Sequence, residues 1–234
     1  GDVYALSGMI KCFGIASYKA NKINELILNN MKKESPIENK QNAMYMISIF
    51  FETMKKLYEP FFVDMFDNIC LMIADRESKV RETAQVCFKG MMKELSGHGV
   101  NEIMPRLIKD LHQMNWKSKV ANIEILGQFA FCAPKQLTIY IPKVIKEIMQ
   151  VLKDPHTKVQ ETAVSVLNDI ASAIQNPEIV DISSILIDAI SNPYEKSTNA
   201  LSALLETEFR HYLDSPSLAL IIPIIDYNLK SQNN

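Results

Sequence analysis

The chain has 234 residues, of which 47% are hydrophobic and 22% are charged, and its formal net charge is −2 at pH 7. This composition supports a folded, elongated domain with a continuous core, and the charge argues against a dedicated nucleic-acid-binding domain but not against a local basic edge. The four cysteines are widely spaced and form no Cys-x-x-Cys pair, which indicates buried thiols.

Hydrophobic periodicity predicts helices along the whole chain, and the scarcity of glycine and the prolines at helix starts favour the same assignment. In chain order, helices are expected at residues 3–14, 18–33, 39–56, 58–74, 77–96, 101–114, 117–131, 136–152, 156–175, 178–191, 195–209 and 216–230. From residue 18 to residue 209 consecutive helices form five antiparallel pairs. The first and last helices are expected to lack partners.

One short phrase recurs four times, at steps of 40, 39 and 38 residues: an acid or amide, a lysine four positions later, and then an apolar helical stripe. The copies are Asp75 with Lys79, Asn115 with Lys119, Asp154 with Lys158, and Asn192 with Lys196. A fixed period of this length predicts a solenoid of stacked helix pairs.

The apolar stripe repeats together with the phrase. The stripe that runs from Val80 to Leu95 returns 79 residues later, so Phe88 and Leu167 are predicted to be equivalent core positions. A further copy is expected at Leu201, Leu204, Leu205 and Phe209.

Basic residues recur at the turns between helices, so a stacked array would align them along one edge. The candidate edge consists of Arg76, Lys79, Arg81, Lys117, Lys119, Lys158 and Lys196. Two interpretations stay open. In the first, Asp75 and Asp154 form an internal ladder with neighbouring turns and the lysines are merely solvated. In the second, the edge meets the phosphates of structured RNA without reading bases.

No catalytic motif is found. The chain has no glycine-rich phosphate loop, no G-x-S-x-G and no H-E-x-x-H, and its four histidines (His98, His112, His156, His211) lie in different repeats. We therefore expect no enzyme activity, cofactor, metal or small-molecule substrate. The large ring of Trp116 is expected to seal one inter-repeat layer. The most apolar run, Leu218–Ile225, is too short to span a membrane, and a cytoplasmic location is expected.

Several strings resemble a known family. The phrase formed by Asp75, Val80 and Arg81 resembles the HEAT-repeat consensus. Longer strings are Leu95–Val100 (LSGHGV), Cys132–Leu137 (CAPKQL), Asn176–Ile179 (NPEI) and Leu204–Ile221 (LLETEFRHYLDSPSLALI). Together they resemble the HEAT-repeat translational activators of the general amino-acid control pathway, in the region that is itself similar to fungal translation elongation factor three.

The resemblance implies an all-α fold, a right-handed α-solenoid of antiparallel HEAT-repeat helix pairs. It also implies one continuous array over residues 1–234, with about five full repeats, cut from a much longer solenoid. Its implied function is that of a non-enzymatic scaffold that contacts the ribosome, through rRNA or a ribosomal protein. Such a scaffold supports activation of the starvation-responsive kinase of translation initiation factor two alpha, which is expected to bind a segment outside this chain.

Another role for a HEAT array is that of a transport receptor or of a phosphatase regulatory subunit. Cargo receptors line their groove with repeated tryptophan and asparagine residues. This chain has one tryptophan, which favours the ribosome-associated scaffold.

Overall fold

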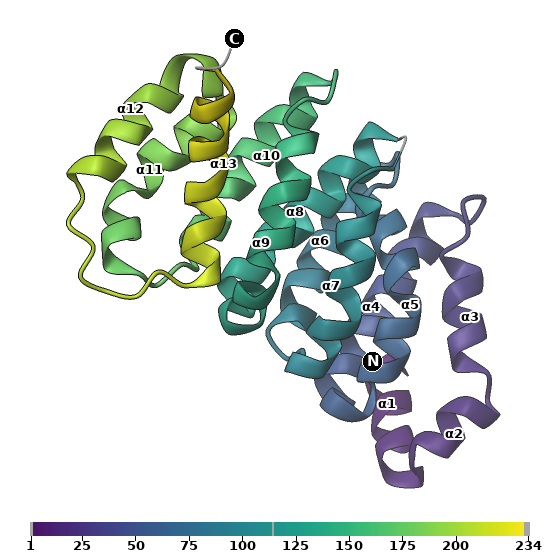
Figure 1. Cartoon of the computed structure of the whole chain (residues 1–234). Coiled ribbons are helices and arrows are strands. Elements are labelled where there is room, and N and C mark those ends of the chain that lie inside the picture. Colours follow the sequence, from purple (N-terminus) through teal and green to yellow (C-terminus); the bar gives the residue numbers. More distant parts are fainter. Residues whose placement is uncertain (1, 114, 232–234) are drawn as a thin grey trace. The chain divides into compact units, whose positions relative to one another are not determined.

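The computed structural model describes residues 2–113 and 115–231, and α-helices make up most of them (Figure 1). In chain order the helices are α1 (Asp2–Phe13), α2 (Ile15–Ala20), α3 (Ile23–Asn30), α4 (Ile37–Met54), α5 (Glu59–Ile73), α6 (Ser78–Met92), α7 (Gly97–Asp110), α8 (Trp116–Cys132), α9 (Pro134–Val151), α10 (Thr157–Ala171), α11 (Pro177–Ser191), α12 (Pro193–Glu206) and α13 (Ser215–Ser231). No strand occurs among these residues, and the predicted all-α class is confirmed. Residue 114, the predicted end of one helix, lies outside the described residues.

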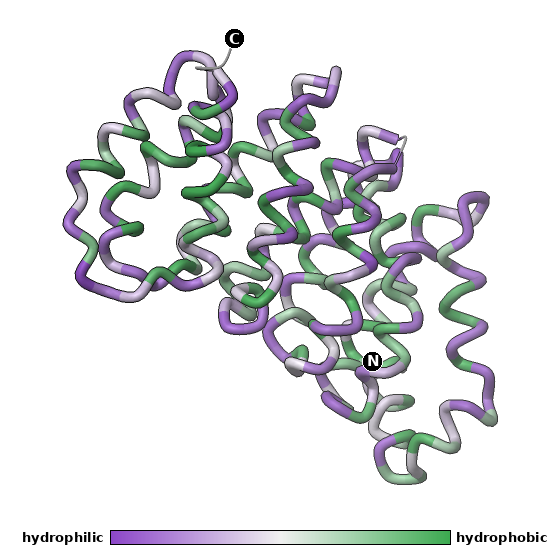
Figure 2. The backbone as a smooth tube through the Cα atoms, viewed as in Figure 1, coloured by the Kyte–Doolittle hydropathy of each residue, from purple (hydrophilic) through white to green (hydrophobic). Residues whose placement is uncertain are grey.

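The described residues fall into two compact units, which divide within α7 between Arg106 and Leu107. Within both units, hydrophobic and hydrophilic residues alternate along the helices (Figure 2). This is the pattern that places one face of each helix in a core. The single continuous array over residues 1–234 stays a prediction.

In the first unit, α4 packs against both α6 and α1. The helix predicted to lack a partner, at residues 3–14, therefore has one in α4. Aromatic rings fill the core around Tyr18, Phe50 and Tyr58, and the two tyrosine hydroxyl oxygens lie 3.1 Å apart. Burial raises the pKa of Tyr18 to about 12, so this pair is neutral at physiological pH.

The single helix predicted at 18–33 is wrong, because the chain turns after Ala20 and divides it into α2 and α3. The Asn21 side-chain amide donates to the Ser17 carbonyl oxygen at 2.8 Å, and Lys22 adopts a left-handed conformation with φ of 51°. Asparagine side chains commonly end helices by bonding the backbone in this way. The spacing of apolar residues gives no information on a side-chain hydrogen bond to the backbone, so it could not predict this break in the helix.

In the second unit, α8 packs closely against α10. A Cβ atom on Gly127 would lie 2.9 Å from Val166 Cγ2 and 3.0 Å from Asp169 Oδ2, so the absent side chain permits this close approach. Burial raises the pKa of the nearby Asp169 carboxyl.

The last three helices depart from the expected stacking. α11 packs against α10, while α13 packs against α9, α11 and α12, so the helix predicted at 216–230 is not unpaired. α12 packs against α11 and α13 and buries only the small residues Ser197 and Ala200. The copy of the core stripe predicted at Leu201, Leu204, Leu205 and Phe209 is therefore wrong: Leu205 is 80% exposed, and α12 ends before Phe209.

Of the helices that the structure describes, none combines the length and the hydropathy needed to cross a membrane.

The prediction that Phe88 and Leu167 are core positions is confirmed, since both side chains are fully buried. We expect Phe88→Ala and Leu167→Ala each to lower the free energy of unfolding by about 2–5 kcal/mol, through lost burial and the cavity left behind. Chemical denaturation measures this change. The exposed Val86→Ala and Leu205→Ala serve as controls and should cost no more than about 0.5 kcal/mol. Equal stability of the core and surface variants would contradict this packing.

Candidate functional site

Of the candidate basic residues, Arg76 lies in the turn before α6, and the others lie in the first turns of helices: Lys79 and Arg81 in α6, Lys117 and Lys119 in α8, Lys158 in α10, and Lys196 in α12. Arg76, Lys79 and Arg81 belong to the first unit, whereas Lys117, Lys119, Lys158 and Lys196 belong to the second. We call these positions the turn edge of each unit.

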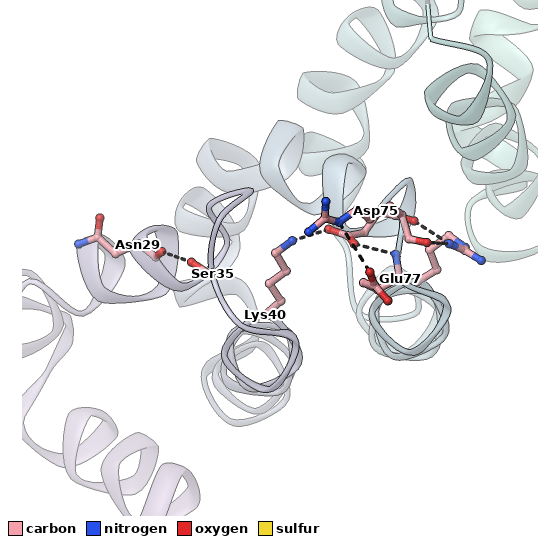
Figure 3. Close-up of polar contacts among 7 residues, drawn as sticks. Asn29, Ser35, Lys40, Asp75 and Glu77 are labelled. Atoms are coloured by element: carbon pink, nitrogen blue, oxygen red, sulfur yellow. Dashed lines mark hydrogen bonds and ion pairs between the residues drawn. The ribbon is translucent and has the colours of Figure 1, made fainter.

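At the turn before α6, Asp75 is held by two different partners (Figure 3). Its Oδ1 accepts from the Glu77 backbone N–H at 3.0 Å, and its Oδ2 accepts from Lys40 Nζ at 2.8 Å. Only 4% of the Lys40 side chain and 8% of the Asp75 side chain are exposed. The ion pair therefore links the first turn of α4 to the turn before α6 in a largely dry environment.

The turn before α10 repeats this arrangement. Asp154 Oδ1 accepts from the His156 backbone N–H at 2.9 Å, and Asp154 Oδ2 accepts from Lys119 Nζ, whose side chain is 19% exposed. The hydrogen bond from the Lys119 ammonium holds the pKa of Asp154 below its usual value, although desolvation opposes the shift. We call Lys40–Asp75 and Lys119–Asp154 the ladder pairs; in both, lysine and aspartate are 35 residues apart.

Two of the seven candidate residues are thus engaged internally. Lys119 neutralises Asp154, and Arg81 Nη1 donates to the backbone oxygens of Asp75 and Arg76 at 2.7 and 2.8 Å. These two residues therefore agree with the internal-ladder interpretation, because their side chains are bonded within the chain and do not face a partner. Lys40 was missed from the sequence, although it lies 39 residues before Lys79 and continues the same period.

The other five basic residues are exposed: Arg76, Lys79, Lys117, Lys158 and Lys196. Two of them form long ion pairs, Arg76 Nε at 3.6 Å from Glu77 and Lys158 Nζ at 3.8 Å from Glu161, and the side chains of both pairs are exposed. Exposed pairs of this kind contribute little to stability, so both charges are accessible to a partner.

Where the repeated phrase has asparagine in place of aspartate, the side chain serves its own helix. Asn115 Oδ1 accepts from the Lys117 backbone N–H at 2.9 Å and caps α8, and Asn192 Nδ2 donates to Glu195 Oε2 at 2.7 Å. A neutral amide cannot neutralise a lysine of the preceding turn. Whether the repeated phrase has aspartate or asparagine therefore determines which lysines can form an ion pair with it.

Trp116, predicted to seal one inter-repeat layer, contacts the next repeat at the surface and is not buried in the core. Its side chain is 40% exposed, and its ring stacks on that of His156 at a centroid distance of 4.1 Å and an interplanar angle of 16°. Lys117 Nζ lies 5.7 Å from the centre of the Trp116 ring. The Trp116–His156 stack therefore connects the starts of α8 and α10 at the surface, next to two exposed lysines.

The most specific of the resembling strings has a structural role at the start of α11. Glu178 Oε1 accepts from His211 Nδ1 at 2.7 Å and from the Arg210 backbone N–H at 3.2 Å, and the bond from His211 lowers the pKa of Glu178. Asp214 Oδ1 accepts from the Ser217 backbone N–H and so begins α13. These bonds fix the loop between α12 and α13.

Metal chemistry finds no support in the part of the chain that the structure describes, where no three His, Cys, Asp or Glu side chains are placed to hold an ion. What the turn edges offer is exposed cationic charge and one half-exposed aromatic stack.

The lowered pKa of Asp154 predicts a pH-dependent part of the stability. A carboxyl whose pKa is lower in the folded chain contributes stability above its unfolded pKa of about 3.9, and this contribution is lost as the pH falls through the folded value. We expect Asp154→Asn, which keeps the oxygen for the His156 N–H, to be less stable than wild type at pH 7 by about 1 kcal/mol or more. The difference should shrink below about pH 4.

Urea denaturation between pH 7 and pH 3 measures this difference. Asp226→Asn is the control, because Asp226 forms an exposed pair with Lys230 and should change stability by no more than about 0.5 kcal/mol. A deficit of Asp154→Asn that is the same at every pH would contradict the assignment.

Comparison with known proteins agrees with this architecture. The chain is 36% identical over 96% of its length to "Stalled ribosome sensor GCN1" of Homo sapiens, of which it spans 8%. It is 34% identical over its full length to "eIF-2-alpha kinase activator GCN1" of Dictyostelium discoideum, and 29% identical over 96% of its length to the protein of that name in Saccharomyces cerevisiae; it spans 9% and 8% of them. The chain thus spans less than a tenth of these relatives.

The predicted resemblance to the HEAT-repeat translational activators is confirmed. Residues 2–167 match the family described as EF3 N-terminal HEAT repeat, and this match ends within α10, before the helices that depart from regular stacking. The chain belongs to the EF3 N-terminal HEAT repeat family.

Proposed function

We propose that this chain is a non-enzymatic scaffold segment that contacts the ribosome and supports activation of the kinase of translation initiation factor two alpha. The observation that carries the proposal is the similarity to the GCN1 proteins over nearly the whole chain. The names of these proteins describe a stalled-ribosome sensor and a kinase activator. We place the kinase contact in a segment outside this chain, and the protein in the cytoplasm.

The contact with the ribosome is proposed to be electrostatic and to involve rRNA phosphates. The exposed residues Arg76, Lys79, Lys117, Lys158 and Lys196 would make it, whereas Lys119 and Arg81 would hold the turns in shape. Lysine and arginine side chains that neutralise phosphates release condensed counterions, so such binding weakens as salt rises. A net charge of −2 does not oppose this, because a local group of exposed basic residues can attract phosphate on a chain whose overall charge is slightly negative.

The proposal predicts a separation between ribosome binding and stability. We expect Lys117→Glu combined with Lys158→Glu to weaken co-sedimentation with ribosomes at least several-fold and to reduce the salt slope by about 2. The melting temperature should change by only a few degrees, because both side chains are exposed. Lys135→Glu combined with Lys143→Glu is the control, since it makes the same charge change at exposed positions of α9.

Two results would contradict different parts of the proposal. If the turn-edge variant and the α9 control lose affinity equally, the contact is not localised at the turn edge. If wild type fails to sediment with ribosomes at low salt, the proposed ribosome contact of this segment is wrong.

A further inference from the structure

We infer that Trp116, His156, Lys117 and Lys158 form a binding site for an unpaired nucleotide of RNA. This inference rests on the proposed ribosome contact and deepens it. It names a site within the second unit and the kind of RNA that the site takes. The argument depends on three features of the Trp116–His156 stack: its exposed ring, its hydrogen-bond donor and the charges beside it.

The first feature is the ring of Trp116. One part of it is covered by His156 at 4.1 Å, yet 40% of the side chain stays exposed to solvent. An aromatic ring that is held flat and half-exposed is a surface on which a nucleobase stacks, and tryptophan has the largest such surface. Lys117 Nζ lies over the ring, 5.7 Å from its centre, and a stacking base would displace this flexible, exposed side chain while its charge stays close.

The second feature is the orientation of His156. Its Nδ1 accepts a hydrogen bond from the Lys158 backbone N–H at 3.2 Å, and it thereby caps α10. Because Nδ1 serves as acceptor, a neutral ring must carry its proton on Nε2. The Nε2–H group is thus assigned as a donor for an oxygen or nitrogen acceptor of a bound nucleotide.

The third feature is the distribution of charge. Lys117 and Lys158 are both exposed, and the acid paired with Lys158 is Glu161, an equally exposed side chain at 3.8 Å. The carboxylate of Asp154, which would otherwise repel a phosphate, is neutralised by Lys119. The same ladder pair ties the starts of α8 and α10 together, so the stack is formed before any ligand binds, which limits the entropic cost of binding.

These features match an unpaired nucleotide better than a duplex. Bases in a helix are stacked on one another, whereas loop and single-stranded bases can be splayed out onto aromatic side chains. The site would take a base on Trp116, an acceptor atom on His156 Nε2–H and flanking phosphates on Lys117 and Lys158. No feature of it selects one base, so we expect tolerance of sequence.

Trp116 is the only tryptophan in the chain, which makes its fluorescence a direct reporter of base stacking. Titration with an unpaired RNA oligonucleotide of about ten nucleotides should quench its emission and saturate. A blunt RNA duplex of the same length at the same salt should quench it much less. Emission that is unchanged by the single strand would overturn the inference.

Variants test the roles of the two rings through the anisotropy of a labelled oligonucleotide. Trp116→Ala should weaken binding about tenfold. Trp116→Phe keeps an aromatic face and should weaken binding by less than about threefold, which is half of that effect on a logarithmic scale. His156→Asn keeps an oxygen that can cap α10 and removes the ring, so it should weaken binding without altering the helical circular dichroism signal. Equal affinity of Trp116→Ala and wild type would contradict the site.

Ribosome co-sedimentation of the same variants separates this inference from the proposed function. If wild type binds ribosomes and Trp116→Ala binds equally well, the site is wrong and the ribosome contact stands. If Trp116→Ala loses ribosomes while the oligonucleotide quenches nothing in wild type, the surface binds a ribosomal protein and the RNA site is wrong. If the oligonucleotide quenches wild type but ribosomes do not bind, the RNA site stands and the proposed function fails.

Discussion

A lysine at the start of one helix and an aspartate in a turn 35 residues later form the interaction on which both units depend. The two groups are largely removed from water, so each charge would be costly without the other. Each aspartate also accepts a backbone N–H from its own turn, and the pair therefore fixes the turn and its neighbour together. The main consequence is a defined register between successive repeats; the net gain in stability is small, because desolvation of the two charges offsets their attraction.

That constraint divides the periodic lysines into two groups with different roles. Lys40 and Lys119 each form an ion pair with an aspartate and are largely buried, whereas Lys79, Lys158 and Lys196 are exposed. The residues that look alike in the repeated phrase thus differ in what they can contact. The turn that carries Asp154 of this ladder pair also carries His156, whose ring stacks on Trp116, so a structural bond and the proposed RNA site share one turn.

Much of the fold could be predicted from the sequence, because the apolar stripe reports directly which side chains face the next helix. Phe88 and Leu167 are buried as predicted for this reason. The stripe fails at Leu205, where α13 lies against α9 and α12 is left on the outside of the unit. It also fails at Asn21, whose side chain ends a helix through a bond that periodicity does not encode. For the candidate site, residue type and repeat period were sufficient to locate the turns. Lys119 and Lys158 look equivalent in the sequence, and only the ion-pair partners in the structure distinguish them.

The measurement that tests the central role of the ladder pair most directly is a double-mutant cycle on Lys119 and Asp154. Unfolding free energies of wild type, Lys119→Met, Asp154→Asn and the double variant give the coupling between the two side chains. We expect a coupling of about 1 kcal/mol or more, against about 0.5 kcal/mol or less for the exposed pair of Lys158 and Glu161. Coupling of Lys119 and Asp154 that does not exceed that of the exposed pair would contradict the account.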